Sequence, residues 1–471
     1  MPDVILIRPI SESWAGEAYK RHVSIPHGPL TLAAHLIDKG FSVQIIDEIA
    51  LTTTVAQDRL LDLLEEAPVC IGITTMTGMQ IRMGRKFASL VRETNPNIPI
   101  VWGGAHPTIL PEMTIKDEYV DIVVYGEGDI SFPFLVSQLK EKDDISKVPG
   151  IYYMDNNGSV GTVLHTDAPP PYDLNLIPEL PYHLLDMELY ITSIKKKYIT
   201  RYFEINSSRG CPFNCAFCYN SKEDSTYTKK DSEKIIKEIK YLLNNYHIDG
   251  LTFSDENFIV NSKRMREIAE TLVNLDMNLH IRSGGRIELF VKFDDDMLKL
   301  IKEAGFYHFG FGIESGSEIT LRMINKKITL KQIYDTVDKI RKHGFQATYN
   351  FIAGFPNETI TEYKKTLALI HHIFENSTYV VYPVPAPSYF VPFPGTISHD
   401  ETVKLGYESP TTFDKWSDID YNIDEMPWLK KDFHDFIVES REIINNINQK
   451  FTGDDAVITK SDLAPLRKII N

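Results

Sequence analysis

Residues 208–219 read Ser-Arg-Gly-Cys-Pro-Phe-Asn-Cys-Ala-Phe-Cys-Tyr, which places Cys211, Cys215 and Cys218 in a Cys-x3-Cys-x2-Cys array. The array directly follows an apolar stretch, 203–207, that we expect to form a β-strand. The chain contains four cysteines in total, and the remaining one, Cys70, lies far upstream. A disulfide framework would use an even, dispersed set, so this spacing favours a metal site in a reducing compartment.

Three thiolates on one short loop can bind three irons of a [4Fe–4S] cluster and leave the fourth iron without a protein ligand. A bidentate amino acid can occupy that iron through its amino and carboxylate groups, as the methionyl part of S-adenosylmethionine (SAM) does. A structural zinc site normally takes four protein ligands, and no other Cys or His lies close enough in sequence to complete one obviously. The array therefore predicts a cluster, with zinc as the alternative.

From about residue 201 onward, predicted strands alternate with predicted helices. Six β/α units suggest a partial (β/α)6, TIM-like barrel rather than a closed eight-fold one. The predicted strands are 203–207, 250–254, 279–282, 306–311, 346–353 and 379–382, and the predicted helices are 231–245, 262–274, 294–304, 330–342 and 359–374.

The first 150 residues also alternate between strands and helices, which predicts an α/β, doubly wound (Rossmann-like) domain with a parallel sheet. We expect the strands at 3–8, 42–47, 69–74, 98–102 and 121–125, helices at 30–39 and 81–93, and the end of a further helix at 60–66. Such sheets bind ligands beyond the carboxyl ends of their strands. Small and polar residues follow three of the strands at this edge, namely Thr74, Thr75, Met76, Thr77, Gly103, Gly104, His106, Gly126, Glu127 and Gly128.

Residues 150–164 predict a β-hairpin that turns at Asn156, Asn157 and Gly158, and a Pro-rich linker follows at 169–181. We therefore divide the chain into the doubly wound domain, a hairpin and linker, the partial barrel, and a small C-terminal region that completes or caps the substrate site. The corresponding ranges are 1–145, 146–195, 196–385 and 386–471.

Cys211, Cys215, Phe217 and Cys218 match the CxxxCxxC signature of the radical SAM enzymes, including the aromatic residue before the last cysteine. A doubly wound domain ahead of such a barrel resembles the cobalamin-binding domain of the cobalamin-dependent members. The resemblance covers about residues 1–400, and it implies three cofactors, a [4Fe–4S] cluster, SAM and cobalamin. It also implies that the residues named above at the carboxyl edge of the first sheet contact cobalamin. The SAM contacts that it implies are Phe217, Tyr219, Ser254, Glu256, Arg286, Glu314, Ser315 and Ile352.

The sequence departs from the family pattern in two places. The Asp-x-His-x-x-Gly motif that supplies a histidine to cobalt in methionine synthase-type domains is absent. We therefore expect cobalamin with its own base displaced and with no histidine from that motif below the metal. The second barrel strand lacks the Gly-Gly-Glu that many members place there for the methionyl amine, and Ser254–Glu256 is the candidate replacement.

Two further residues have simpler interpretations. We expect His106 to be a loop residue packed near the ligand face rather than a cobalt ligand. We expect Cys70 to fill a small, buried, apolar position in its strand. No cysteines then remain for a second cluster, which disfavours the subfamilies that need one.

The resemblance implies a radical methyltransferase as the activity. An electron from the cluster splits SAM into methionine and a 5′-deoxyadenosyl radical, which abstracts hydrogen from an unactivated carbon, and methylcobalamin delivers the methyl group. One alternative is a radical cyclase or ring-rearranging oxidative enzyme in which cobalamin is a redox cofactor or is no longer bound. Another is a non-catalytic iron–sulfur or zinc protein.

The charge balance bears on the partners. The chain has 50 Lys and Arg against 65 Asp and Glu, a net charge of −15, which works against broad contact with phosphate backbones or anionic membranes. We therefore expect a small-molecule substrate and no nucleic acid, and the resemblance adds an external electron donor such as flavodoxin or ferredoxin. The N-terminus lacks the features of a signal peptide and no run of about 18 apolar residues occurs, so we expect a cytoplasmic protein with no membrane span.

Overall fold

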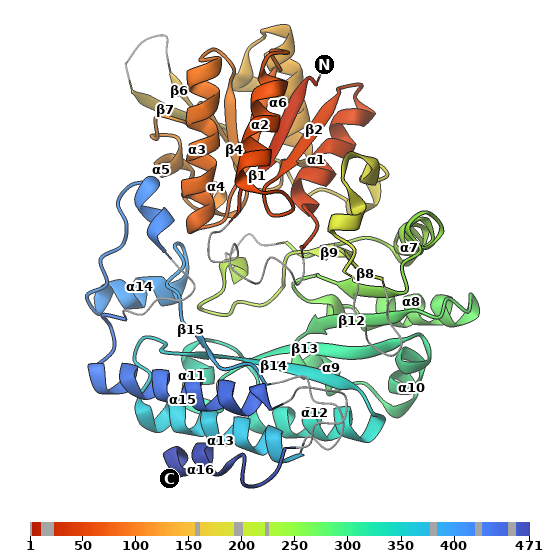
Figure 1. The fold of residues 1–471 in the computed structure, drawn as a ribbon, viewed down its shortest axis with the longest axis vertical. Coiled ribbons are helices and arrows are strands. Elements are labelled where there is room, and N and C mark those ends of the chain that lie inside the picture. Colours follow the sequence, from red (N-terminus) through yellow and green to blue (C-terminus); the bar gives the residue numbers. More distant parts are fainter. Residues whose placement is uncertain are drawn as a thin grey trace. The chain divides into compact units, whose positions relative to one another are not determined.

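The computed structural model of the protein describes residues 2–10, 23–155, 161–192, 201–221, 226–376, 384–419, 426–450 and 458–471. By their contacts these residues form two compact units. The first unit contains the described residues up to Thr192 together with 409–419. The second contains those from 201 to Glu408 and from 426 onward. Figure 1 shows that each unit is built on its own β-sheet.

The sheet of the first unit has the strand order β2-β1-β3-β4-β5-β6-β7. Its first five members are parallel, and β6 and β7 add an antiparallel hairpin at the β5 edge. The strands are β1 (Val4–Arg8), β2 (Val43–Asp47), β3 (Cys70–Thr74), β4 (Ile100–Gly103), β5 (Ile122–Val124), β6 (Ile151–Asp155) and β7 (Thr162–His165).

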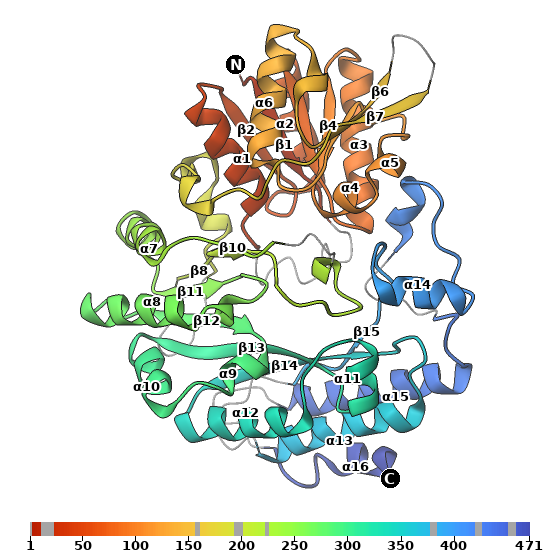
Figure 2. The ribbon, with the colours of Figure 1, turned by 180° about the vertical axis from the view of Figure 1, so that it is seen from behind.

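Helices cover both faces of this sheet (Figures 1 and 2). Helix α1 (His27–Asp38) packs with α6 (Gly128–Glu141), and α2 (Thr53–Leu64) packs with α3 (Met79–Thr94). Since a parallel sheet covered on both faces exposes no strand to water, its strands read as nearly continuous apolar runs, such as Val-Ile-Leu-Ile in β1. The doubly wound fold predicted from the sequence is confirmed. The predicted hairpin strands are present, and the turn at Asn156, Asn157 and Gly158 lies outside the described residues.

The core of the first unit is completed by a segment from the far end of the chain. Phe413 and Trp416 are buried in the same apolar cluster as Trp102 of β4 and Phe87 of α3. The rings of Trp102 and Phe413 lie 5.1 Å apart, edge to face. Residues 409–419 therefore belong structurally to the first unit, although the sequence-based division groups them with a separate C-terminal region.

The Pro-rich stretch also packs on the first unit. Leu174 and Ile177 within it, and Tyr182 and Met187 directly after it, are buried. Tyr190 donates a hydrogen bond to Asp47 Oδ2 at 2.7 Å, and Asp47 is the last residue of β2. This stretch is therefore an ordered part of the unit, held by spaced apolar side chains, rather than an open linker.

The sheet of the second unit is entirely parallel, in the order β15-β14-β13-β12-β11-β8. This curved sheet confirms the predicted partial barrel. The sixth predicted strand, 379–382, lies outside the described residues, and β15 instead pairs with β14. The strands are β8 (Tyr202–Ile205), β11 (Gly250–Phe253), β12 (His280–Gly285), β13 (Phe306–Glu314), β14 (Gln346–Ala353) and β15 (Ser388–Tyr389).

Helices follow these strands in turn and lie along one side of the sheet (Figures 1 and 2). They are α7 (Ser232–Tyr246), α8 (Ser262–Asn274), α9 (Ile287–Phe290), α10 (Asp295–Glu303), α11 (Glu318–Met323), α12 (Leu330–His343) and α13 (Ile360–Asn376). Helices α15 (Lys431–Gln449) and α16 (Ala464–Ile470) pack against α13, and α14 spans Ile397–Lys404. None of the helices in the described part of the chain has the length and apolar character needed to cross a membrane.

Local signals set the helix ends. Thr329 and Gln332 form a reciprocal capping box at the start of α12, and Gly344 ends that helix in the left-handed conformation, with φ +66°. Asn261 and Asp294 cap α8 and α10 through their side chains. These caps explain why the sequence predicts the helix positions well.

Candidate cluster and cofactor sites

The cysteine loop begins at the carboxyl end of β8. The short strand β9 (Ser208–Arg209) pairs with β10 (Thr228–Lys229), and the three cysteines follow. Gly210 has φ +75°, and a Cβ there would lie 2.6 Å from the Thr226 carbonyl oxygen, so the loop requires glycine at this position. Within the loop, Cys218 N donates to Cys215 O at 3.0 Å.

A buried carboxylate anchors the start of the loop. Asp255, which follows β11, accepts hydrogen bonds from the backbone N of Ser207 at 3.2 Å and from its hydroxyl at 2.8 Å, and a further one from the Ser208 hydroxyl. Arg264 of α8 donates to the Ser207 carbonyl oxygen at 2.8 Å. Asp255 therefore holds the entry to the loop in place. Its neighbours Ser254 and Glu256, which we predicted as SAM contacts, are both exposed.

The far side of the loop is bonded to the turn that follows α11. Ala216 N donates to Ile324 O at 2.9 Å, and Asn325 Nδ2 donates to Asn214 O at 2.5 Å. Arg286, which follows β12, donates through Nη1 to Cys215 Sγ at 3.0 Å and through Nη2 to the Lys326 carbonyl oxygen. Backbone and side-chain bonds thus fix the cysteine loop on both sides.

The thiols lie close enough to influence one another. Burial raises the pKa of the Cys218 thiol to about 11, and the neighbouring Cys215 and Cys211 act in the same direction. Burial likewise raises the pKa of Cys211. Because iron binds the thiolate, its charge would offset this cost and loading would release protons.

The arrangement of possible metal ligands distinguishes a [4Fe–4S] cluster from a single zinc ion. Among the described residues, no group of three or more His, Cys, Asp or Glu side chains converges on one metal-ion position. In a [4Fe–4S] cluster each cysteine binds a different iron, so convergence on one point is not required. Three neighbouring thiols in one loop therefore fit the cluster.

A buried ion pair lies beside the cysteine loop. Lys326 Nζ lies 2.8 Å from Glu314 Oε1, and both side chains are less than one-tenth exposed. Glu314 ends β13 at an irregularity in its pairing with β14, and it adopts φ +67°, which is uncommon for a residue other than glycine. Lys326 Nζ also lies 5.8 Å from the centre of the ring of Phe217, the residue directly before the third cysteine in the sequence. The predicted residues Glu314 and Phe217 are thus brought together, and Lys326 joins them from a distant turn.

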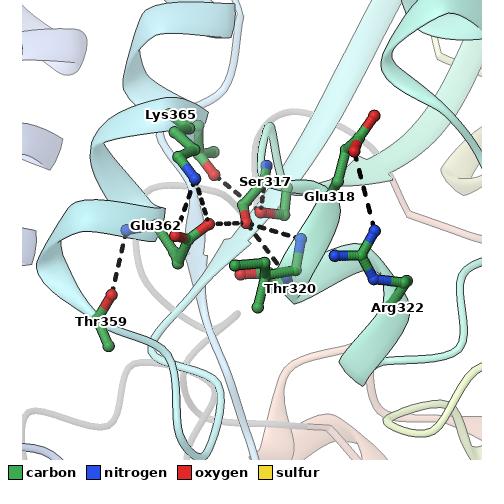
Figure 3. Close-up of polar contacts among 10 residues, drawn as sticks. Ser317, Glu318, Thr320, Arg322, Thr359, Glu362 and Lys365 are labelled. Carbon is green, nitrogen blue, oxygen red and sulfur yellow. Dashed lines mark hydrogen bonds and ion pairs between the residues drawn. The ribbon is translucent and has the colours of Figure 1, made fainter.

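The residues after Glu314 face α13. Ser315 is fully buried, and its hydroxyl lies 3.0 Å from Thr366 Oγ1. Figure 3 shows the next layer, in which Ser317 bonds to Glu362 and accepts from the backbone N of Thr320 at 3.1 Å, while Lys365 Nζ lies 2.9 Å from Glu362 Oε1. The hydroxyl of Ser315, which we predicted as a SAM contact, therefore has a hydrogen-bond partner inside the protein, Thr366.

The other predicted SAM contacts lie at the same edge of the sheet. Ile352 of β14 packs with Phe217 and Phe355 in one apolar cluster, and Tyr219 is 39% exposed. Two buried polar atoms at this edge, Ser283 Oγ and Glu288 Oε2, have no hydrogen-bond partner among the described residues. Buried polar atoms without a partner are available to form hydrogen bonds with a polar ligand when one is bound. Lys326, Ser283 and Glu288 were not singled out from the sequence, because no local motif marks them.

The carboxyl edge of the first sheet has the character expected of a ligand face. Thr75 is buried and its hydroxyl has no partner among the described residues. Met76 is 50% exposed, and Gly126 and Glu127 are exposed. Gly126 has φ +76° with open space where a Cβ would lie, so a ligand can approach its backbone. This edge fits cobalamin, which needs apolar contact and backbone donors rather than a charged pocket.

Gly104 and His106 have roles inside the protein. A Cβ on Gly104 would lie 2.6 Å from Thr74 Oγ1, so this glycine serves close packing of two loops. His106 lies in helix α4 (Ala105–Ile109), not in a loop as predicted, and it is fully buried. Its Nδ1 lies 2.9 Å from Thr77 Oγ1, and its ring lies 5.5 Å from Phe413 and 5.7 Å from Trp416. Burial lowers the pKa of His106 to about 3, so the imidazole is neutral.

Two models of known protein families match the chain, one in each unit. Residues 205–370 match the model of the radical SAM superfamily, and residues 21–136 match the model of the B12 binding domain. The chain belongs to the cobalamin-dependent radical SAM enzymes. In this family's terms, the second unit is the radical SAM domain and the first unit is the B12-binding domain.

Individual proteins also resemble the chain over most of its length. It is 29% identical over 458 residues to the uncharacterized methyltransferase PH0819 of Pyrococcus horikoshii, covering 94% of each chain. It is 28% identical over 341 residues to the anaerobic magnesium-protoporphyrin IX monomethyl ester cyclase of Rubrivivax gelatinosus, covering 71% of this chain and 60% of the cyclase. The fold matches the radical SAM methyltransferase TsrM of Kitasatospora setae, solved with cobalamin and a [4Fe–4S] cluster, with a TM-score of 0.66 at 16% identity over 88% of this chain and 81% of that one.

Proposed function

We propose that this enzyme is a cobalamin-dependent radical SAM methyltransferase that methylates an unactivated carbon of a small molecule. The observation that carries the proposal is the three-cysteine loop, fixed at the carboxyl edge of the parallel sheet in a chain that also has a B12-binding domain. A relative that matches 94% of the chain is named as an uncharacterized methyltransferase, which favours methyl transfer over other radical reactions.

Cys211, Cys215 and Cys218 would hold the cluster, each binding a different iron as a thiolate. When bound, the cluster and SAM supply a 5′-deoxyadenosyl radical, and cobalamin supplies a methyl group. The protein's own task is to orient these groups and to keep water away from the radical. The apolar cluster of Phe217, Ile352 and Phe355 supports the second role.

The Glu314–Lys326 pair would receive the methionyl end of SAM. That end carries an ammonium and a carboxylate, so the two protein charges match it in sign and number. Opening the pair to a ligand of opposite polarity exchanges one charge-assisted contact for two, within a buried site where such contacts are strong. Tyr219, Ser254 and Glu256, at the exposed rim, would contact the more polar parts of SAM.

Cobalamin would lie at the edge formed by Thr75, Met76, Gly126, Glu127 and Gly128. His106 is not expected to bind cobalt, because its imidazole contacts Thr77 and is packed against Phe413 and Trp416. This packing supports the expectation, drawn from the missing Asp-x-His-x-x-Gly motif, that no histidine lies below the metal. An external reductant such as flavodoxin or ferredoxin, and a cytoplasmic location, complete the proposal.

A radical cyclase is the second candidate, because cyclases are also among the similar proteins. The two candidates differ in the fate of the SAM methyl group. The test uses the full chain, reconstituted anaerobically with iron, sulfide and hydroxocobalamin, and supplied with methyl-labelled SAM and a reductant. Methyl transfer predicts label in the corrin fraction together with 5′-deoxyadenosine. A cyclase predicts 5′-deoxyadenosine with no labelled corrin.

Two cysteine variants control this experiment. Cys218→Ala should abolish formation of 5′-deoxyadenosine, because the cluster loses one of its ligands. Cys70→Ala should retain it, since Cys70 is fully buried in β3 of the first unit. Cleavage of SAM by the Cys218→Ala protein would contradict the proposal.

A further inference from the structure

Arg286 has a partner at every nitrogen of its guanidinium group. Nη1 donates to Cys215 Sγ at 3.0 Å, Nη2 donates to the Lys326 carbonyl oxygen, and Nε donates to Glu288 Oε1. One face of the group lies 4.2 Å from the centre of the Phe213 ring. With 6% of the residue exposed, little of the guanidinium remains for another ligand.

These contacts differ from those expected of a SAM-binding arginine. A carboxylate is normally bound by two parallel N–H groups on one edge of the guanidinium. In Arg286 the edges are taken by a cysteine sulfur, a backbone carbonyl and Glu288. Its partners come from the cysteine loop and from the turn that carries Lys326, so one side chain ties together the cluster ligands and the Glu314–Lys326 pair.

We propose that Arg286 is a positioning residue of the iron–sulfur cluster, which fixes Cys215 and raises the cluster's reduction potential, rather than a SAM-binding residue. This inference rests on the proposed cluster. Hydrogen bonds to cluster sulfurs and nearby positive charge favour the reduced form, which carries one more negative charge. Glu288 moderates the effect of the charge, while the N–H···S bond remains directed at the ligand sulfur.

The structure also suggests why lysine cannot replace this arginine. A single ammonium cannot reach the sulfur, the carbonyl and Glu288 with the fixed fork geometry of a guanidinium, and it lacks the flat face that stacks on Phe213. Arg286→Lys therefore keeps the positive charge and removes the geometry. Arg286→Gln removes both.

The test is a redox titration of the reconstituted full chain, without SAM, followed by electron paramagnetic resonance. Both Arg286 variants should have a more negative midpoint potential than the wild type, with the larger shift in Arg286→Gln. The affinity for SAM, measured by equilibrium dialysis, should stay within about twofold, a change of less than 0.5 kcal/mol. Arg282→Lys is the matched control, because Arg282 lies on β12, four residues before Arg286, and contacts Tyr202 and His308 rather than the cysteines.

The outcomes separate this inference from the proposed function. Unchanged midpoint potentials in both variants would overturn it, as would a loss of SAM affinity of tenfold or more with the potential unchanged. Failure of folded Arg286 variants to load iron, while Arg282→Lys loads normally, would support positioning, since SAM is absent during loading. Failure of the wild type to bind a cluster would instead refute the proposed function.

Discussion

A buried carboxyl group in the turn after β14 gives the structure a specific pH dependence. Glu358 is 6% exposed, and its Oε2 accepts a hydrogen bond from Gly354 N at 2.8 Å. Its Oε1 is buried as well. Burial raises the pKa of Glu358 from its ordinary 4.5 to about 8, and nearby Glu362 adds to the increase. The group is therefore protonated in the folded protein at neutral pH.

The difference between the pKa of Glu358 in the folded protein and in the unfolded chain sets the sign and size of its effect on stability. The folded state holds the proton more tightly than the unfolded chain, so the stability contributed by Glu358 is complete below about pH 4.5 and is lost as pH rises to about 8. A difference of about 3.5 pKa units corresponds to an upper limit of about 5 kcal/mol. Glu358→Gln has no titrating group and keeps an acceptor for Gly354 N, so it should escape this loss.

The assay is urea denaturation of the wild type and Glu358→Gln at several values between about pH 5 and pH 8. The two proteins should differ by no more than about 1 kcal/mol at pH 5, since glutamine resembles the protonated acid. The variant should gain several kcal/mol over the wild type by pH 8. All other titrating groups are common to both proteins, so the difference isolates Glu358. A difference that does not change with pH would refute the reasoning.

Three further predictions concern the core, the ion pair and the cysteines. Trp416→Ala should cost about 3–5 kcal/mol of stability, measured by denaturation, while iron loading of the second unit stays normal; unchanged stability would contradict the assignment of 409–419 to the first core. Lys326→Met should weaken SAM binding about tenfold or more, measured by equilibrium dialysis, and should lower folding stability because it leaves the buried Glu314 charge unpaired. Adding Glu314→Gln should restore the folding stability, since no buried charge is then unpaired, but it should not restore the affinity for SAM. Cys70→Ala should retain the iron content of the wild type by metal analysis, and a loss of iron would show that Cys70 has a role at the cluster.

Much of the architecture follows from local sequence. Apart from β15, the sequence predicts the strands of both sheets to within a few residues, because parallel strands covered by helices read as apolar runs between turn residues. The cysteine loop was equally clear, since its three ligands occupy eight consecutive positions. Buried Cys70 was also correctly predicted.

What the sequence could not provide comes from contacts between distant segments. Glu314 was expected at a strand end, but its left-handed backbone and its pairing with Lys326 depend on a turn that folds back after α11. Nothing in the sequence around Arg286 reveals Cys215, 71 positions away, as its partner. Trp416 shows no periodic pattern that would place it in the core of the first unit, more than 300 positions from Trp102.

The central claim is a [4Fe–4S] cluster held by Cys211, Cys215 and Cys218, with one iron left for SAM. Mössbauer spectroscopy of the chain reconstituted with isotopically enriched iron tests it most directly. The account predicts that addition of SAM changes the signal of about one iron in four and leaves the other three as they were. Four irons that do not respond to SAM, or zinc bound in place of iron, would contradict it.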